Sequence, residues 1–361
     1  MDINTIKQEL SKITDPDLGI ALGDLNAIKN ITISEDVIFV EIELVQPLHW
    51  VTSAINDTCA KVLSETYPGY KSELVLTERQ QDYYSRESLK GVKNIIAVSS
   101  GKGGVGKSAI AANIASALSL SGAAVGILDA DIYGPSQPTM FGIPDEAFDV
   151  EEKEDGKVVA YPRVKHGIKV ASMGFAMNRD QAAIIRGPLL AGYFTMLFEQ
   201  LEWGNLDFLI IDLPPGTGDV QLTMTQKLAL SGAVIVTTPQ EVSLADVRRG
   251  IAMFNKVDVD ILGIIENMSY FTAPELPDKK YYIFGKGGGQ KTALENNIPF
   301  LGEVPLDIKM RESNDGGTPI VLANDGGKQA EILRNISAKL ISELRKRNFK
   351  VLENDSLKIE L

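Results

Sequence analysis

Two kinds of hydrophobic pattern alternate along the first 80 residues. Apolar residues recur at helical spacing from Ile3 to Ile13 and again from about Leu48 to Tyr67. Between these segments, the runs AIKNITI and VIFVEIEL alternate apolar and polar positions on either side of a short polar stretch, which predicts a β-hairpin. The run SELVLTE predicts a further strand. The order α-β-β-α-β therefore predicts a small α+β domain over residues 1–80.

A different pattern begins after residues 81–92, a polar stretch that is predicted to be a linker. Apolar, β-rich runs now alternate with helical segments, and several runs lack polar alternation, as strands covered on both faces do. Residues 93–347 are thus predicted to form an α/β domain with a doubly wound, mostly parallel sheet. A helix over about 328–345 ends this domain, and residues 348–361 are expected to form a loosely held tail. The predicted strands are NIIAVSS, AAVGILDA, IKVASMG, DFLIIDL, AVIVTTP, ILGIIEN and FLGEVPL.

Composition narrows the class of protein. The 361 residues are enough for two domains, and 44% hydrophobic with 23% charged residues is typical of a soluble globular protein. No apolar run is long enough to span a membrane, and the first residues do not resemble a signal peptide, so we expect a cytoplasmic protein that does not use the membrane. A net charge of −12 argues against a nucleic-acid partner. A single cysteine excludes an intrachain disulfide.

The segment GKGGVGKS, residues 101–108, fits the phosphate-binding pattern G-x-x-x-x-G-K-[ST]. It follows a predicted strand and opens a predicted helix, where glycine N–H groups and the helix N-terminus surround a phosphate. Lys107 is expected at the β- and γ-phosphates of ATP, and the Ser108 hydroxyl on Mg²⁺. The alternative, a glycine-rich turn before a helix, does not explain why all three features coincide. The predicted nucleotide-binding residues here are Gly101, Lys102, Gly103, Gly104, Val105, Gly106, Lys107, Ser108 and Ala109.

Three aspartates follow predicted strands in places that suit a metal-dependent reaction. Asp212 ends the apolar run DFLIID, the position of a Walker B carboxylate that holds Mg²⁺ through water. Asp129 and Asp131, in LDADIYGPS, end the run that follows the phosphate-loop helix. We expect Asp129 to contribute to the metal site and Asp131 to orient the attacking water. Asp131 also fits a turn or an N-cap before Gly134.

Several long motifs in one order resemble the Mrp/ApbC family of deviant Walker A ATPases, whose wider group includes MinD, ParA, the arsenite-pump ATPase and the nitrogenase iron protein. The similarity covers residues 94 to about 345. The first 80 residues resemble the small domain that is often fused ahead of this ATPase and that occurs alone in iron–sulfur assembly factors. The matching motifs are GKGGVGKS, DADIYGPS, IRGPLL, IIDLPPGTGDV, VTTPQEVSLADVRRG, IIENMSYF, IFGKGGG and VPLD.

The resemblance implies roles for residues that the patterns alone do not assign. Lys102 corresponds to the signature lysine, which in this group reaches the phosphates of the other subunit of a homodimer, so Lys102, Lys107 and Asp131 form the expected catalytic set. Asn267 corresponds to a residue that contacts adenine. Residues 129–136 and 212–219 correspond to the two nucleotide-sensing switches, although a rigid Pro-Gly turn also fits DLPPGTGD.

The family's iron–sulfur ligands are missing from this chain. The Cys-x-x-Cys that follows NMSYF in cluster-bearing members aligns with Ala273 and Leu276, neither of which ligates iron. Cys59 lies on an apolar helical stripe with Val51, Ile55 and Val62, which favours a buried packing role. The resemblance therefore implies no cluster ligands here, and a bound cluster is doubtful.

We therefore expect a homodimeric Mg-ATP-dependent ATPase that acts in iron–sulfur cluster assembly or transfer, with apoproteins or assembly factors as clients. The alternative is a nucleotide-switched positioning ATPase like MinD or ParA. Such action needs a membrane-binding C-terminal helix or a basic DNA-binding face, and neither fits the acidic last residues or the net charge. A reductase like the nitrogenase iron protein is excluded, because it needs two cluster cysteines per subunit.

Overall fold

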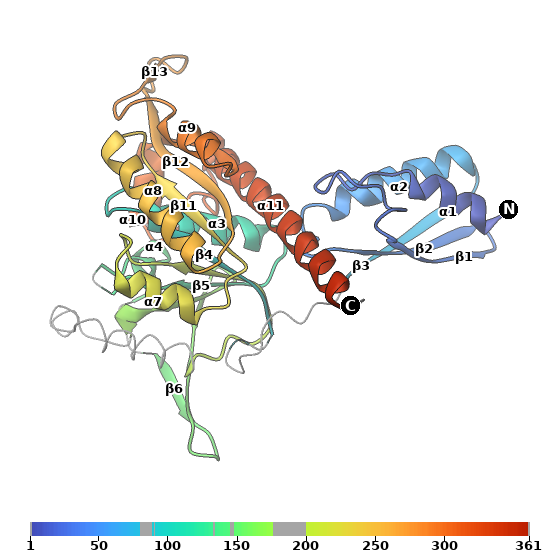
Figure 1. Cartoon of the computed structure of the whole chain (residues 1–361), viewed down its shortest axis with the longest axis horizontal. Helices are drawn as coiled ribbons and strands as arrows, with labels where there is room; N and C mark the ends of the chain where they lie inside the picture. The colour runs from blue at the N-terminus through green and yellow to red at the C-terminus, as the bar shows by residue number, and fades with distance from the viewer. Residues whose placement is uncertain are drawn as a thin grey trace. The chain divides into compact units, whose positions relative to one another are not determined.

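The computed structural model of the chain describes residues 2–79, 89, 91–132, 134–144, 148–175 and 200–359, with only the backbone at 219–220 and 354–359. The chain forms two compact units. The smaller, N-terminal unit combines residues 1–82 with 341–361, and the larger unit spans 83–340 (Figure 1). The motif IRGPLL and most of the predicted linker lie outside the described residues.

The N-terminal unit follows the order of elements predicted from its hydrophobic pattern. Strands β1 and β2 form an antiparallel hairpin, and β3 pairs with β2 in parallel. Alternate residues of β2 are buried, and they pack against buried apolar residues of both helices, such as Leu10 and Ile55. The elements are α1 (Ile3–Ser11), β1 (Ile28–Ser34), β2 (Val37–Leu44), α2 (Thr52–Thr66) and β3 (Lys71–Glu78).

The C-terminal helix differs from the prediction. Helix α11 runs from Gly327 to Ile359, so residues 348–361 are not a loosely held tail as far as they are described, and residues from 341 onward belong to the N-terminal unit. A buried ion pair is among the contacts that attach this part of the helix to the N-terminal unit. The Arg345 guanidinium, fully buried, donates two hydrogen bonds to the Asp15 carboxylate at 2.7 and 3.0 Å. It also donates to Asp17 and to the Val45 carbonyl oxygen.

The larger unit is built on a parallel sheet, as predicted. Its seven parallel strands lie in the order β14-β12-β11-β4-β10-β5-β9, with short antiparallel strands β13 and β8 at the edges. Figure 1 shows helices α3, α8 and α9 along this sheet, where they contact β4, β11 and β12, respectively. The sheet strands are β4 (Val92–Ser99), β5 (Val125–Asp129), β8 (Arg163–Lys165), β9 (Ile168–Ser172), β10 (Leu206–Asp212), β11 (Gly232–Thr237), β12 (Ile261–Thr272), β13 (Lys280–Tyr281) and β14 (Phe300–Leu306).

The helices on the sheet bury its two faces. One core cluster joins Ile95 and Ala97 of β4 to Val247 and Phe254 of α8. Strand β4 is buried at almost every position, which explains why its sequence lacks polar alternation. The helices of this unit are α3 (Lys107–Leu120), α4 (Gln137–Met140), α7 (Asp219–Lys227), α8 (Glu241–Lys256), α9 (Gly288–Glu295) and α10 (Ile308–Asp315). In the described part of the chain, no helix is both long and apolar enough to cross a membrane.

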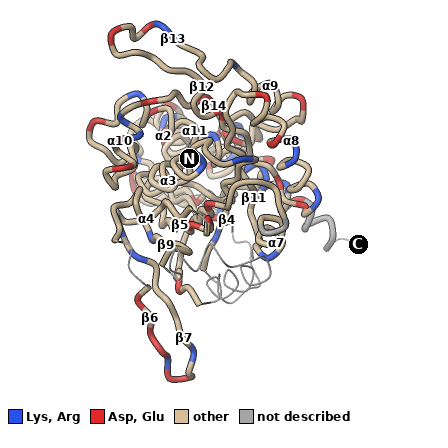
Figure 2. Tube along the Cα trace, turned by 90° about the vertical axis from the view of Figure 1, so that its left-hand side faces the viewer, with Lys and Arg blue, Asp and Glu red and all other residues tan. Residues whose placement is uncertain are grey.

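One hairpin in this unit was not predicted. Strands β6 (Asp149–Glu152) and β7 (Val158–Tyr161) form a two-stranded antiparallel sheet apart from the main one. Figure 2 shows acidic residues along β6 and its turn. The hairpin is mostly exposed, so its sequence lacks the apolar face from which strands are recognised.

Replacing Arg345 with alanine should destabilise the N-terminal unit by about 3–5 kcal/mol, because the Asp15 carboxylate would stay buried without its cation. Hydrogen exchange over β1 to β3, followed by mass spectrometry, should become faster. The control is Arg311→Ala, which removes exposed ion pairs on α10 and should change stability by less than about 1 kcal/mol. Unchanged exchange in the Arg345 variant would contradict a stabilising role for the ion pair.

Candidate nucleotide-binding site

The predicted phosphate loop connects β4 to α3 at the carboxyl edge of the parallel sheet. Ligands bind at this edge in open α/β sheets. At two positions of the loop, close neighbours leave room only for glycine. A Cβ on Gly101 would lie 2.3 Å from Cβ of Asp246, and one on Gly106 would lie 2.2 Å from Nδ2 of Asn267. Gly106 also has a φ of 80°, which favours glycine. Gly103 and Gly104 have open space beside them, so this part of the loop is accessible.

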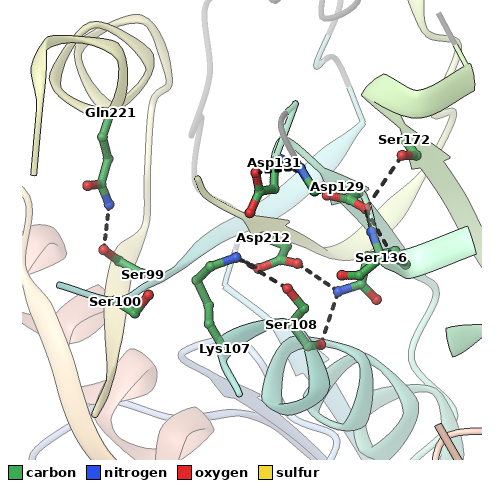
Figure 3. Close-up of polar contacts among 12 residues, drawn as sticks. Ser99, Ser100, Lys107, Ser108, Asp129, Asp131, Ser136, Ser172, Asp212 and Gln221 are labelled. Carbon is green, nitrogen blue, oxygen red and sulfur yellow. Dashed lines mark hydrogen bonds and ion pairs between the residues drawn. The ribbon is translucent and has the colours of Figure 1, made fainter. Parts of the chain in front are cut away.

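Lys107 and Ser108 begin α3 and point toward the ends of neighbouring strands (Figure 3). The Lys107 ammonium group, nearly buried, donates to Asp212 and lies 3.4 Å from the Ser108 hydroxyl. Asp212 is the last residue of β10 and is fully buried. The structure therefore brings together the predicted phosphate-binding lysine, the predicted magnesium serine and the predicted Walker B carboxylate.

Asp129 lies directly beside Asp212, because the two are register partners at the ends of the parallel strands β5 and β10. Asp129 accepts hydrogen bonds from the backbone N–H groups of Ser136 and Gln137, at 2.8 and 2.9 Å. Burial, and secondly the nearby Asp212 carboxylate, raise the pKa of Asp129 to about 7, against the opposing effects of these hydrogen bonds and of Lys107. The two carboxyl groups thus lie side by side in one buried part of the site.

Gln137 is a functional candidate that the sequence analysis missed. It is fully buried at the start of α4, and its side-chain amide donates to Asp212 Oδ2 at 2.8 Å and to the Ser108 carbonyl oxygen at 3.0 Å. It lies one residue beyond the motif DADIYGPS. A single glutamine beside a proline carries no recognisable pattern, so no sequence signal identified it.

The remaining predicted residues lie around the same loop. Lys102 contacts Oε1 of Gln240 at 3.2 Å, and Asn267 donates to the Val105 carbonyl oxygen at 2.8 Å. Asp131 accepts from the Gly134 N–H at 3.3 Å, as a turn residue does. Ala109 lies in the first turn of α3. The cross-subunit role of Lys102, the adenine contact of Asn267 and the catalytic role of Asp131 remain predictions.

These donors fit a magnesium ion. Mg²⁺ prefers oxygen ligands, keeps several waters and shares phosphate oxygens, so it needs few ligands from the protein. The Ser108 hydroxyl and the carboxylates of Asp129 and Asp212 are oxygen donors at the loop that is predicted to hold the phosphates. Within the described ranges, no group of three or more His, Cys, Asp or Glu side chains could hold a metal by itself.

A second glycine-rich loop, residues 285–289 in the motif IFGKGGG, precedes α9. Its helix N-terminus already holds an anion of the chain itself. The buried Glu266 carboxylate accepts the Gly289 N–H at 2.6 Å, and burial raises the pKa of Glu266. A phosphate would compete with this carboxylate, so we assign nucleotide binding to the loop at 101–108 and not to this one.

Comparison with known proteins identifies the family of this chain. The profile of the "NUBPL iron-transfer P-loop NTPase" family matches residues 91–341. This chain belongs to that family. Residues 3–76 match a second profile, "Iron-sulfur cluster assembly protein". Both matches confirm the resemblance to the Mrp/ApbC family and to its small fused domain.

Two relatives illustrate the similarity to known members of the family. An "Iron-sulfur cluster carrier protein" of Synechocystis is 47% identical over 93% of this chain and 96% of its own length. The "Iron-sulfur cluster transfer protein NUBPL" of Dictyostelium discoideum is 44% identical over 77% of this chain and 84% of its own.

Solved structures confirm the fold. A nucleotide-binding protein of Archaeoglobus fulgidus in complex with ADP is 38% identical and covers 67% of this chain and 93% of its own, with a TM-score of 0.57. The cell division ATPase MinD of Pyrococcus furiosus covers 69% of this chain and 98% of its own at 21% identity and a TM-score of 0.51, and it shows the fold alone.

The two positions that align with the family's cysteines lie in a turn after β12. Ala273 follows the end of β12, and Leu276 is half-exposed in the same turn, where its N–H donates to the Ala273 carbonyl oxygen. Cys59 is fully buried in α2, within the core of the N-terminal unit. Burial raises the pKa of its thiol to about 12, which disfavours the thiolate that iron requires.

Raising the pH from about 4 to 7 should lower the stability of the larger unit through Asp129. A buried carboxyl with a raised pKa contributes stability below its unfolded pKa, and this contribution is lost as the pH rises through the folded pKa. Asp129→Asn should flatten this part of the profile of Tm against pH, measured by calorimetry. The exposed Asp315→Asn is the control, and an unchanged profile in the Asp129 variant would refute the assignment.

Proposed function

We propose that this chain is a Mg²⁺-dependent ATPase that acts as a homodimer in iron–sulfur cluster assembly or transfer. The observation that carries the proposal is the convergence of Lys107, Ser108 and Asp212 on the open side of a glycine-rich loop. The names of the relatives support the choice of cargo, since those proteins are called cluster carriers.

The geometry supports a step in which Lys107 exchanges one anionic partner for another. Lys107 pairs with Asp212, and the β- and γ-phosphates of ATP are competing anions for the same ammonium group. When Lys107 turns to the phosphates, Asp212 loses its cation and gains the capacity to orient the ligands of Mg²⁺. That ion, when bound, supplies positive charge to the phosphate oxygens. The site thus converts triphosphate binding into a rearrangement at the end of β10.

The second lysine explains the proposed dimer. Lys102 lies on the loop. Among the described residues it pairs with no carboxylate, and it donates to the neutral amide oxygen of Gln240. A hydrogen bond to a neutral group is weaker than one to a charged group, so Lys102 can leave it for a phosphate at low cost. We infer that it completes the site of a second subunit and makes hydrolysis depend on pairing.

The proposed cargo needs ligands from elsewhere. A [4Fe–4S] cluster takes four thiolates, and a homodimer of this chain holds two cysteines, both buried. We therefore infer that the cluster is a substrate whose thiolates come from a cysteine-bearing partner, and that this chain supplies the nucleotide-driven change of shape.

The two lysines should respond differently to mutation. Lys107→Ala should weaken MgATP binding at least about tenfold, because the phosphates lose their charged donor. Lys102→Ala should bind MgATP within about twofold of wild type and lose turnover by about 10³-fold, as arginine fingers do. Isothermal calorimetry and phosphate release measure the two effects, with the exposed Lys309→Ala as control. Full turnover in the Lys102 variant would argue against a trans role.

The cluster claim has its own test. After anaerobic reconstitution with iron and sulfide, wild type and Cys59→Ser should both hold far less than one cluster per dimer, by absorbance and iron content. A variant with both Ala273→Cys and Leu276→Cys places two thiols in one turn and should bind cluster. Stable, stoichiometric cluster in wild type would show that this chain has ligands of its own.

A further inference from the structure

Gln137 holds together three parts of the candidate site. Its side-chain nitrogen donates to the Walker B carboxylate, Asp212, and to the backbone of the phosphate loop at the Ser108 carbonyl oxygen. Its own backbone N–H donates to Asp129. One fully buried residue therefore contacts both carboxylates that are predicted to face the metal and the loop that is predicted to face the phosphates.

The orientation of the amide follows from its partners. The nitrogen faces a carboxylate oxygen and a carbonyl oxygen, and both accept hydrogen bonds. If the amide were turned over, its oxygen would face two other acceptors, so the donors must point this way. The amide oxygen, Oε1, consequently points away from Asp212. It is buried, and none of the residues that the structure describes forms a hydrogen bond with it.

A buried amide oxygen without a partner is unusual, because its desolvation is not compensated. Gln137 leaves this oxygen unpaired among the described residues and places its two N–H donors on Asp212 and on the phosphate loop, so the contacts of the nitrogen account for the orientation of the side chain. Lys107 does not serve this oxygen, because its ammonium group is engaged with Asp212 and lies near Ser108.

We propose that Gln137 is a positioning residue for magnesium: its amide nitrogen orients the Asp212 carboxylate and ties it to the Ser108 carbonyl oxygen of the phosphate loop. This inference rests on the proposed MgATP-dependent function. It adds a residue that lies outside the phosphate loop and the strand ends. Through this residue, nucleotide affinity depends on the metal.

The experiment measures how much Mg²⁺ strengthens nucleotide binding. A fluorescent ADP analogue is titrated into the full-length protein with excess Mg²⁺ and again with EDTA, and the ratio of the two affinities is compared. In Gln137→Leu this ratio should fall by about tenfold, the effect of losing a hydrogen bond to a charged group. The affinity in EDTA should stay within about twofold of wild type. Gln137→Met, of similar length and flexibility, should reproduce the loss.

The control is Gln329→Leu. Gln329 is also buried in the larger unit and also donates its side-chain amide to a carbonyl oxygen, that of Pro305, but it lies on α11. Its loss should leave the ratio unchanged. The Tm of each variant identifies unfolded protein, and the Met variant replaces a Leu variant that fails to fold.

The possible outcomes distinguish the positioning role of Gln137 from the proposed MgATP-dependent function. If wild type binds the analogue more tightly with Mg²⁺ and the Gln137 variants keep the full ratio, the positioning role is wrong while the proposed function stands. Equal weakening with and without Mg²⁺ likewise indicates a purely structural glutamine and overturns the inference. If wild type does not bind the analogue, the proposed function fails first and the inference fails with it.

Discussion

The architecture of the site depends on two carboxylates buried side by side. Asp129 and Asp212 end adjacent parallel strands in register, with no exposed surface on either residue. Like charges so placed repel each other strongly in a medium that water does not screen. Lys107, the side chain of Gln137 and two backbone N–H groups all converge on them, which accounts for the arrangement of α3 and α4 around these strand ends.

The two glycine-rich loops show how the same residue types lead to different chemistry. Residues 101–108 and 285–289 both pair glycines with a lysine ahead of a helix. In the second, a buried glutamate from β12 already occupies the N-terminus of the helix. In the first, Asp212 holds Lys107, and Gly103 and Gly104 have open space beside them. The position of one acidic side chain therefore distinguishes a structural loop from a candidate phosphate site.

Much of this site could be predicted because its residues are adjacent to strand ends. The seven apolar runs predicted the seven parallel strands in their order along the chain. Asp129 and Asp212 stand at the ends of two of these strands. Gln137 could not be predicted, since its importance comes from contacts with residues 29 and 75 positions away. The exposed β6–β7 hairpin was also missed, because a strand without a buried face has no periodic signal.

The C-terminal helix was mispredicted for a related reason. Its second half has no broad apolar face in sequence, and among the buried residues that hold it is Arg345, whose partner, Asp15, lies 330 positions earlier. Pairings over such distances leave no local trace in a sequence. The family match supplies the cargo of the relatives but not the ligands of this chain, where one buried cysteine replaces the expected set.

Asp15 and Arg345 lie 330 positions apart in the sequence, and this separation has a consequence for biosynthesis. At about 5–20 residues per second, a ribosome takes roughly 15 to 70 seconds to travel from one to the other. During that interval, the Asp15 carboxylate of the first domain to emerge has no Arg345 to pair with. The contact between Asp15 and Arg345 therefore forms only after nearly the whole of this sequence has been made.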